Sequence, residues 1–470
     1  MATEKSSASA SGPQAVVSGG STRRFRHILL GVVLLAAGLR LAAVIWIPTQ
    51  PVSDGWSYFQ RASNVLDSGR YEAIPGRPDA TFPPGYPLLL AASFLFSTDR
   101  LISAKILNVL LGAASVWLVG SLGRRFMGEK VGLLSAAILA LMPRSVLMPA
   151  LIRSENLFIP LLLLWLLLAF EASQTQRPWR VSFMAGALLG CLTLVRTVAY
   201  ALSLVWPFAL RPQRASAWKT AGHWLLVLVV QHAIMTPWVL RNMSTLGAPV
   251  LLSTVGGVDL LIGNSPNASG GWYPWAEYMR SIDPLFDQRD IVDQDRRARQ
   301  VALGWIAAHP ASALRLYFEK WRLMFANDRY VADFAIFVTD ISPPWPPQDA
   351  LPGPHVLKIH EDIVIGVLNG SYWVLMAFEI LGLMAWLGIR WKRAGVWPRG
   401  PLVLLAAALY FPAVSAVFLA QTRFRWPATD LMIPFAAFLL VQMAKWLSQR
   451  STTRPAHPER SRPTAGTSTG

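Results

Sequence analysis

The chain has 470 residues, of which 53% are apolar and only 15% are charged, and its formal net charge is +17. Such a composition, with a positive mean hydropathy, excludes an ordinary soluble multidomain protein. The sequence contains repeated apolar runs of roughly 20 residues, the length that crosses a bilayer as a helix. Because these runs are continuous and do not alternate with polar residues, they predict spanning helices and not a β-barrel.

The positive charge is distributed as in a membrane protein. Much of it lies in short loops between the apolar runs, which the positive-inside rule explains. No basic stripe lies on a soluble domain, so we expect no nucleic-acid partner. The single cysteine, Cys191, lies inside an apolar run and excludes an intramolecular disulfide.

The N-terminal part predicts a tail, a permanent first span and an external loop. Residues 1–22 are rich in Ser, Ala and Gly, and we expect them to form a disordered cytoplasmic tail. The first span covers about Ile28 to Ile47 and follows a group of basic residues, which places its N-terminal end in the cytoplasm. It is too long for a signal peptide, and no small-residue cleavage site follows it. The loop 48–87 should therefore lie outside.

The later apolar runs bring the prediction to about ten spans. The stretch 88–96 is too short to cross and predicts an interfacial or re-entrant helix. Residues 181–210 predict two short helices that meet near Arg196, because basic residues lie at both ends. Both termini then lie in the cytoplasm. The other spans are predicted at about 101–122, 131–148, 157–170, 224–240, 363–388, 402–419 and 433–447.

This topology divides the chain into four parts after the N-terminal tail. Residues 23–240 form a transmembrane module, and residues 241–362 form an external, periplasmic subdomain. The helical pattern from Arg289 to Phe325 fits an amphipathic helix pair on the membrane surface, or an exposed subdomain that packs on itself. Residues 363–447 carry the last spans, and we expect residues 448–470 to be a disordered tail.

Asp54 is the first candidate for chemistry. It follows the end of the first apolar run by seven residues, and aromatic and basic residues follow it in the loop. A carboxylate just outside a membrane face can act as general base toward a hydroxyl or amine acceptor. Asp54 could equally be a solvated loop residue that caps a helix beginning near Trp56.

Two more candidates lie where apolar segments begin or break. Glu155 follows Arg153 and Ser154 at the start of a span, where a carboxylate could complement the helix dipole or form part of an active site. Arg196 divides two apolar segments. An arginine at membrane depth costs at least ~2.5 kcal/mol and usually faces a polar cavity or partner. That partner is a lipid phosphate or a carboxylate such as Glu155.

Arg423 and Arg425 lie in the last external loop. Arginines on the outer face oppose the usual charge bias, which favours phosphate binding, although anchoring at the interface would also place them there. The histidines are scattered, and no pair has ligand spacing with a third partner, so we expect no metal and no other cofactor. P-loop and GxSxG motifs are absent, which disfavours soluble nucleotide use and serine hydrolase chemistry.

Together these features resemble the GT-C superfamily of integral-membrane glycosyltransferases. The resemblance is to the bacterial branch related to protein O-mannosyltransferases and to the aminoarabinose transferase that modifies lipid A. It extends from Arg23 to Lys445. Four stretches carry it: Ser53-Asp54 through Tyr58 and Gly69-Arg70-Tyr71 to Phe82-Pro83-Pro84-Gly85-Tyr86-Pro87; Pro143 through Ser154-Glu155-Asn156; Pro237-Trp238 with Arg241-Asn242, Gly257 and Gly263-Asn264; and Arg423-Phe424-Arg425-Trp426-Pro427.

The resemblance implies a reaction on the outer face of the cytoplasmic membrane. A sugar on a polyprenyl-phosphate carrier passes to a lipid, glycan or protein acceptor, with inversion at the anomeric carbon. Asp54 matches the aspartate that these families use as base, and Glu155 matches a frequent second carboxylate. Arginine can stabilise a singly phosphorylated leaving group without a divalent metal. Contacts to the donor phosphate or sugar are expected from Arg423, Arg196, Arg61, Tyr58, Arg153, Arg425 and Tyr86.

The chain departs from the aminoarabinose-transferase branch just before the closing prolines of the first loop. That branch has a glutamate and a lysine there, whereas this chain has Thr81-Phe82-Pro83, so we do not assign that substrate. A transporter or flippase of lipid-linked sugars would interrupt helices at matching positions in both halves, and one interrupted pair, near Arg196, is found. An O-antigen ligase or polymerase would instead carry its essential residues in 241–362.

Overall fold

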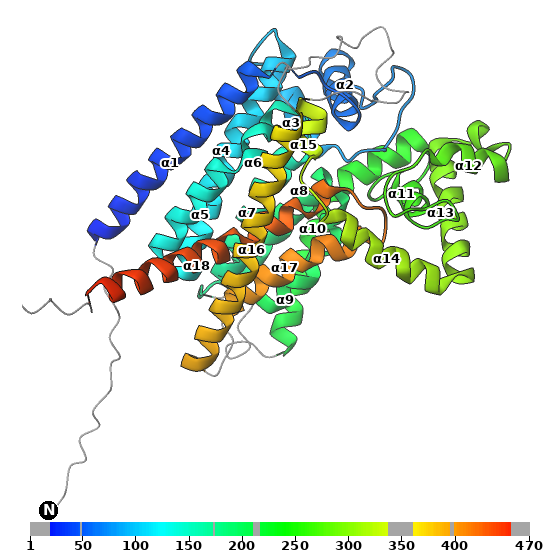
Figure 1. The fold of residues 1–470 in the computed structure, drawn as a ribbon. Coiled ribbons are helices and arrows are strands. Elements are labelled where there is room, and N and C mark those ends of the chain that lie inside the picture. Colours follow the sequence, from blue (N-terminus) through cyan, green and yellow to red (C-terminus); the bar gives the residue numbers. More distant parts are fainter. Residues whose placement is uncertain are drawn as a thin grey trace, which may run out of the picture.

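The computed structural model describes residues 19–47, 49–172, 174–209, 217–336, 361–394 and 399–452. Within these ranges the regular elements are helices, apart from one isolated bridge between Ile74 and Arg77. Long helices form a slanted bundle, with α2 (Asp54–Ser68) at one end of it (Figure 1). The prediction of an all-α polytopic membrane protein is confirmed.

Seven helices in the described part of the chain are long and apolar enough to cross a membrane. An eighth span arises if α5 (Glu129–Leu141) is counted with the helical segment after it, across a bend of 62°. The two remaining predicted spans correspond to shorter apolar helices, η2–α9 (Thr197–Ala209) and α17 (Arg399–Ser415). The seven long helices are α1 (Gly19–Trp46), α4 (Arg100–Met127), α7 (Glu155–Ala172), α8 (Pro178–Val195), α10 (Ala217–Leu246), α16 (Glu361–Ala394) and α18 (Trp426–Thr452).

Both terminal helices extend beyond their predicted ends. Helix α1 begins at Gly19, inside the predicted N-terminal tail, and α18 continues to Thr452, inside the predicted C-terminal tail. Neither extension contains a proline, so nothing in the backbone interrupts the helical hydrogen bonds there. The rest of both predicted tails lies outside the described residues.

The break after α5 is stabilised by an arginine from α1. Arg40 is fully buried and donates hydrogen bonds to the carbonyl oxygens of Leu139 (3.1 Å) and Ala140 (3.4 Å). It also donates to Ser145 in α6 (Pro143–Leu147), at 2.6 Å. Carbonyls in the last turn of a helix lack helical partners. A broken helix is tolerated at membrane depth only where such groups are satisfied, which Arg40 achieves.

The predicted break near Arg196 is present. Helix α8 ends at Val195, and Arg196 has an extended backbone with φ −145° and ψ 125°. The chain continues as the 3-10 helix η2. The change of direction at this residue keeps its side chain inside the bundle instead of placing it on a continuous lipid-facing helix.

The described part of the predicted subdomain 241–362 packs against the connection between α17 and α18. Asn264 donates to the carbonyl of Val417 (2.9 Å), and the amide of Ala420 donates to the carbonyl of Gly270 (2.8 Å). A Cβ at Gly263 would lie 1.5 Å from the carbonyl oxygen of Phe418, so only glycine allows this contact. The subdomain helices are α11 (Gly256–Gly263), α12 (Trp275–Ile282), α13 (Ile291–Ala308), α14 (Pro310–Met324) and α15 (Tyr330–Ala335).

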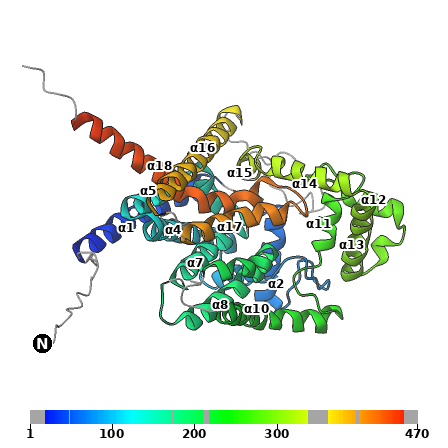
Figure 2. The ribbon, with the colours of Figure 1, turned by 90° about the horizontal axis from the view of Figure 1, so that it is seen from below.

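Helices α11 to α14 project to one side of the bundle (Figures 1 and 2). Helices α11, α12 and α13 share a small apolar core that includes Met279 and Phe286, whereas Met324 at the end of α14 packs against Ala416 and Ala420. Leu303, Leu314 and Phe318 remain exposed on the same helices. The core also includes Leu419, which lies between α17 and α18, so these helices pack on the bundle as well as on one another. The two interpretations of Arg289 to Phe325 stay predictions.

Candidate active site

Asp54 is the first residue of α2, and the local backbone holds it beside the start of α7. The preceding residue, Ser53, has φ +54° and ψ −131°, a conformation that non-glycine residues rarely adopt and that costs about 1–3 kcal/mol. A Cβ on Gly55 would lie 2.7 Å from the carbonyl oxygen of Ile152. The glycine thus allows α2 to contact the segment that leads to Arg153. The helix begins at Asp54 and not near Trp56, so Asp54 does not act as its N-cap.

The start of α7 presents a second carboxylate. Glu155 is the first residue of this helix and is 1% exposed. Asn156 holds the turn before it by donating to the carbonyl oxygens of Leu151 (3.0 Å) and Arg153 (3.2 Å). Ser154 accepts a hydrogen bond from Tyr58 (3.3 Å), which joins α7 to α2.

Two arginines distant in sequence reach these carboxylates. Arg196 Nη1 lies 2.6 Å from Glu155 Oε1, the carboxylate pairing that the sequence leaves open. Arg423, in the 3-10 turn η5 (Thr422–Arg425), places Nη2 2.6 Å from Asp54 Oδ2. Its Nε lies 3.7 Å from Glu155 Oε1. Arg423 therefore connects both carboxylates.

Arg153 completes what we call the arginine–carboxylate cluster, defined as Asp54, Arg153, Glu155, Arg196 and Arg423. Its Nη1 lies 3.7 Å from Asp54 Oδ2, too far for a hydrogen bond. Within the described residues, neither terminal nitrogen of Arg153 has a hydrogen-bond partner, although the side chain is 1% exposed. Its guanidinium lies 4.7 Å from the ring of Phe334. With three arginines and two carboxylates, the cluster has a formal charge of +1, which suits an anionic ligand.

The electrostatics of the cluster keep Asp54 ionised. Burial alone would raise the pKa of this carboxyl, but Arg423 and Arg153 outweigh burial and lower the pKa to about 2. The pKa of Tyr58 is raised to about 12 by burial and by the negative charge of Asp54, so its hydroxyl remains a donor. Asp54 has the most exposed side chain of the cluster, at 25%, followed by Arg196 at 17%, against 1% for Glu155.

The structure does not bring three of the predicted residues into the cluster. Arg61 forms a buried ion pair with Asp79 at 2.5 Å and stabilises the first loop. Arg425 pairs with Asp328 at 2.8 Å. Tyr86 donates to Asn108 (3.0 Å) and packs edge-on against Tyr58, so it stands behind that residue.

Asp328 is the centre of a second buried ionic network. Besides Arg425, it accepts a hydrogen bond from the indole of Trp426 (3.0 Å) and lies 3.4 Å from Arg144. Arg144 also pairs with Asp430 at 2.6 Å. These residues come from α6, from the connection between α14 and α15, and from η5 and α18, so the network joins the subdomain helices to the bundle.

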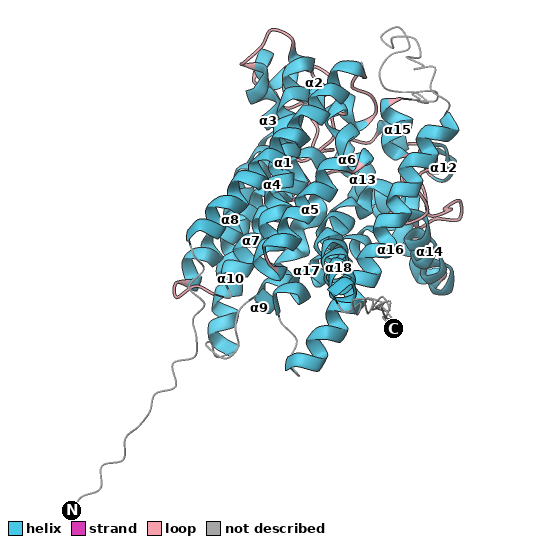
Figure 3. Ribbon diagram, turned by 60° about the vertical axis from the view of Figure 1, so that its left-hand side comes forward, coloured by secondary structure: helices cyan, strands magenta, loops and turns pink. Residues whose placement is uncertain are grey.

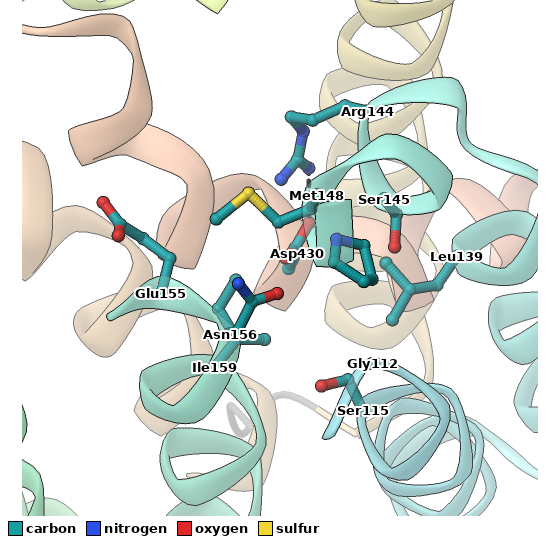
Figure 4. A pocket seen from close by; sticks show the side chains of 11 residues that line it. Gly112, Ser115, Leu139, Arg144, Ser145, Met148, Glu155, Asn156, Ile159 and Asp430 are labelled. Atoms are coloured by element: carbon teal, nitrogen blue, oxygen red, sulfur yellow. Dashed lines mark hydrogen bonds and ion pairs between the residues drawn. The ribbon is translucent and has the colours of Figure 1, made fainter. Parts of the chain in front are cut away.

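A small cavity separates the two ionic groups. The Arg144–Asp430 pair lies on one side of it, and Glu155 and Asn156 at the start of α7 lie on the other. The Glu155 carboxylate points away from Asp430 (Figure 4) and toward the cluster, where Arg196 meets it. The two networks are therefore neighbours with separate charge partners.

Two further residues lie near the cluster, and no feature of the sequence predicts that they belong there. Tyr330 lies under Arg153 and Arg423, with ring centroid distances of 5.6 and 5.1 Å. Asp259 on α11 interacts electrostatically with Asp54, and burial raises its pKa to about 7. Both lie in the part of the chain after α10 and reach the site only because that part folds back onto the bundle. Among the described residues, no group of three His, Cys, Asp or Glu side chains could hold a metal ion.

Comparisons with known proteins agree with this architecture. Residues 81–240 match the family described as dolichyl-phosphate-mannose-protein mannosyltransferase, a range that includes Arg153, Glu155 and Arg196. No curated protein matches the chain by sequence. The fold is similar to that of the archaeal oligosaccharyltransferase AglB from Archaeoglobus fulgidus, in complex with an inhibitory peptide and a dolichol-phosphate. The identity is 13% and the TM-score 0.53, over 95% of this chain and 53% of that chain.

A second structure of the A. fulgidus oligosaccharyltransferase, tethered to an acceptor peptide, gives 13% identity and a TM-score of 0.52, over 92% of this chain and 51% of that one. The chain thus spans about half the length of these enzymes. ArnT from Cupriavidus metallidurans, bound to undecaprenyl phosphate, is 14% identical over 94% of this chain and 82% of that chain, with a TM-score of 0.38. The resemblance to the GT-C glycosyltransferases is confirmed at the level of the fold.

Proposed function

We propose that the protein is a glycosyltransferase that transfers a sugar from a polyprenyl-phosphate donor to a lipid, glycan or protein acceptor. The observation that carries this proposal is the buried arginine–carboxylate cluster, which combines an accessible ionised carboxylate with an excess of guanidinium groups. The fold shared with AglB supports it, since that enzyme was captured with a dolichol-phosphate.

In the proposed reaction, Asp54 is the general base. Its carboxylate takes the proton of the acceptor hydroxyl or amine while the acceptor atom bonds to the anomeric carbon. The bond from that carbon to the phosphate oxygen breaks in the same displacement, so the configuration inverts and polyprenyl phosphate leaves. Asp54 suits this role because it is ionised and partly exposed.

The arginines would hold the phosphate and stabilise the charge that develops on it. Arg153 is the first candidate, because both of its terminal nitrogens lack hydrogen-bond partners within the described residues. Arg423 and Arg196 contribute further positive charge. Guanidinium groups bind phosphate oxygens in bidentate geometry and can replace a metal ion in this task. We assign Glu155 a positioning role, because it is almost fully buried between Arg196 and Arg423.

We place the site on the outer face of the cytoplasmic membrane. The basic ends of several spans gather away from the cluster: Arg125 at the end of α4 pairs with Glu171 at the end of α7, and Arg124 lies over Phe25 of α1. The positive-inside rule assigns such an end to the cytoplasm. The cluster lies at the opposite ends of α1 and α7, which corresponds to the external side.

The test compares a deletion strain complemented with the wild-type gene, Asp54→Asn or Asp67→Asn. Mass spectrometry of glycolipids and glycoproteins should reveal a sugar that the wild type restores and Asp54→Asn does not, because loss of a general base costs about 10²–10⁴-fold in rate. Asp67 lies on the same helix in an exposed pair with Arg100 and should restore the sugar fully. Full restoration by Asp54→Asn at normal protein level would refute the assignment of the base.

A further inference from the structure

The guanidinium groups proposed to hold the donor phosphate already face Asp54. Arg423 Nη2 donates to Asp54 Oδ2 at 2.6 Å, and Arg153 Nη1 lies 3.7 Å from the same oxygen atom. One carboxylate oxygen thus stands where two arginines converge. The carboxylate of Asp54 is thus an anion that the protein itself supplies to these arginines, and we call it the internal anion. Its Oδ2 accepts a hydrogen bond from the charged guanidinium of Arg423.

Contacts of both arginines restrict where they can meet a phosphate together. The Arg423 side chain is held by Gln421, which accepts from Nε at 2.7 Å, and its guanidinium lies over the ring of Tyr330. Arg153 is fixed between Tyr330 and Phe334, with ring distances of 5.6 and 4.7 Å. A phosphate oxygen that contacts Arg423 Nη2 and Arg153 Nη1 together must therefore approach the place that Asp54 Oδ2 occupies.

We propose that Asp54 and the donor phosphate compete for Arg423 and Arg153, so that donor binding releases Asp54 to act as base. This inference rests on the proposed function. In the protein without donor, Arg423 holds Asp54 and makes it a poor proton acceptor. When a phosphate oxygen takes the Arg423 hydrogen bond, the carboxylate loses its strongest partner and becomes available to the acceptor. The base is thus active only when a donor is present.

The competition has a consequence that a purely catalytic role for Asp54 does not have. Removing the carboxylate charge slows transfer by the factor given above and leaves Arg423 and Arg153 without their internal anion. Asp54→Asn should therefore bind a lipid phosphate more tightly than the wild type. We expect an increase in affinity of about tenfold, which is the size of one charge-assisted hydrogen bond.

The experiment uses the full chain in phosphatidylcholine nanodiscs, with undecaprenyl phosphate as the probe and undecaprenol as the control without phosphate. Dissociation constants are measured for the wild type, Asp54→Asn and Asp67→Asn. Asp67→Asn removes the same charge from the same helix at an exposed pair and should bind like the wild type. Asp54→Ser, which also lacks the charge and can stand in the first turn of α2, should show the same gain as Asp54→Asn.

The outcomes separate the two proposals. If the wild type binds undecaprenyl phosphate over undecaprenol but both Asp54 variants bind it equally or more weakly, the competition is refuted while the proposed function stands. An equal gain in affinity in Asp67→Asn would also refute the competition, since the loss of any negative charge on α2 would then have the same effect. If the wild type shows no preference for the phosphate, the proposed function itself fails, and the competition fails with it.

Discussion

At the scale of single residues, burial and partners separate the acidic groups of the site into different roles. Asp54 is partly exposed and is held ionised by arginines. Glu155 is buried and already shared between Arg196 and Arg423. Asp259 has no arginine within salt-bridge distance among the described residues, and burial together with the charge of Asp54 raises its pKa to about 7.

The raised pKa of Asp259 predicts a pH-dependent cost to stability. The folded protein keeps this proton up to about pH 7, whereas the unfolded chain releases it near pH 4, so stability falls as the pH rises through this interval. Asp259→Asn should be more stable than the wild type at pH 8 by roughly 1–3 kcal/mol, and equal to it at pH 4. Thermal unfolding in detergent at both pH values measures this. Asp287→Asn, at an exposed pair in the same subdomain, should show no such difference.

At the scale of elements, glycines set how closely the first loop approaches the bundle. Gly85 begins α3 (Gly85–Phe94), and a Cβ there would lie 2.7 Å from the carbonyl oxygen of Leu194, in the last turn of α8. The Pro83-Pro84-Gly85 turn therefore presses the loop onto the residues just before Arg196. Gly55 makes a similar contact with Ile152, so α2 lies against the segment before Arg153 and α3 against the segment before Arg196. Figure 3 shows α2 and α3 together at one end of the bundle.

Gly85→Ala should therefore displace α3 from α8 and disturb Arg196. Because the clash is with backbone atoms that cannot rotate away, we expect a loss of stability of about 1–3 kcal/mol and weaker binding of undecaprenyl phosphate. Gly31→Ala in α1 is the matched control, since a Cβ there meets nothing within 4 Å. That variant should be neutral or slightly stabilising. Unfolding and the binding of undecaprenyl phosphate are measured on both variants. Gly85→Ala that behaves like the wild type in both measurements would contradict this prediction.

At the scale of the whole molecule, the Asp328 network joins the connection between α14 and α15 to the bundle near the cluster. Arg425 donates to the carbonyl of Met324 (2.6 Å) at the end of α14 and pairs with Asp328. The backbone amide of Asp328 donates to Asn369 of α16 (2.8 Å). This arrangement fixes η5, and with it Arg423, relative to α14, α15 and α16.

Removing Asp328 should destabilise the entire fold. Asp328→Ala leaves Arg425 buried without its carboxylate and weakens the hold on Arg144, which should cost about 3–5 kcal/mol. Asp333→Ala removes a carboxylate five residues away that pairs with Arg329 at the surface, and should cost about 0–1 kcal/mol. Thermal unfolding of the two variants compares them. An equal loss of stability in the two variants would show that the buried network does not stabilise the fold more than the surface pair does.

The sequence by itself determined the helices and the two types of candidate group. Apolar runs and basic flanks are local signals, so the positions of the spans, the break at Arg196 and the helix start at Glu155 could be predicted from them. Residue type and loop position also marked Asp54, Arg196 and Arg423 as separate candidates, and only the family resemblance grouped them, with Arg153, in one prospective site. The extra helical residues at Gly19 and Thr452 were missed, because helix ends have weak signals.

Only the tertiary structure decided which charges meet. Arg423 and Asp54 are 369 positions apart in the chain, and no local pattern specifies that pair. Arg423 and Arg425 lie two positions apart in the same 3-10 turn. Because such a turn has three residues per turn, their side chains point in different directions. Arg423 therefore pairs with Asp54, and Arg425 pairs with Asp328. Arg61 lies closer to Asp54 in sequence but pairs with Asp79. Ion pairing depends on distances of a few ångströms, which the packing of helices fixes and the order of residues does not.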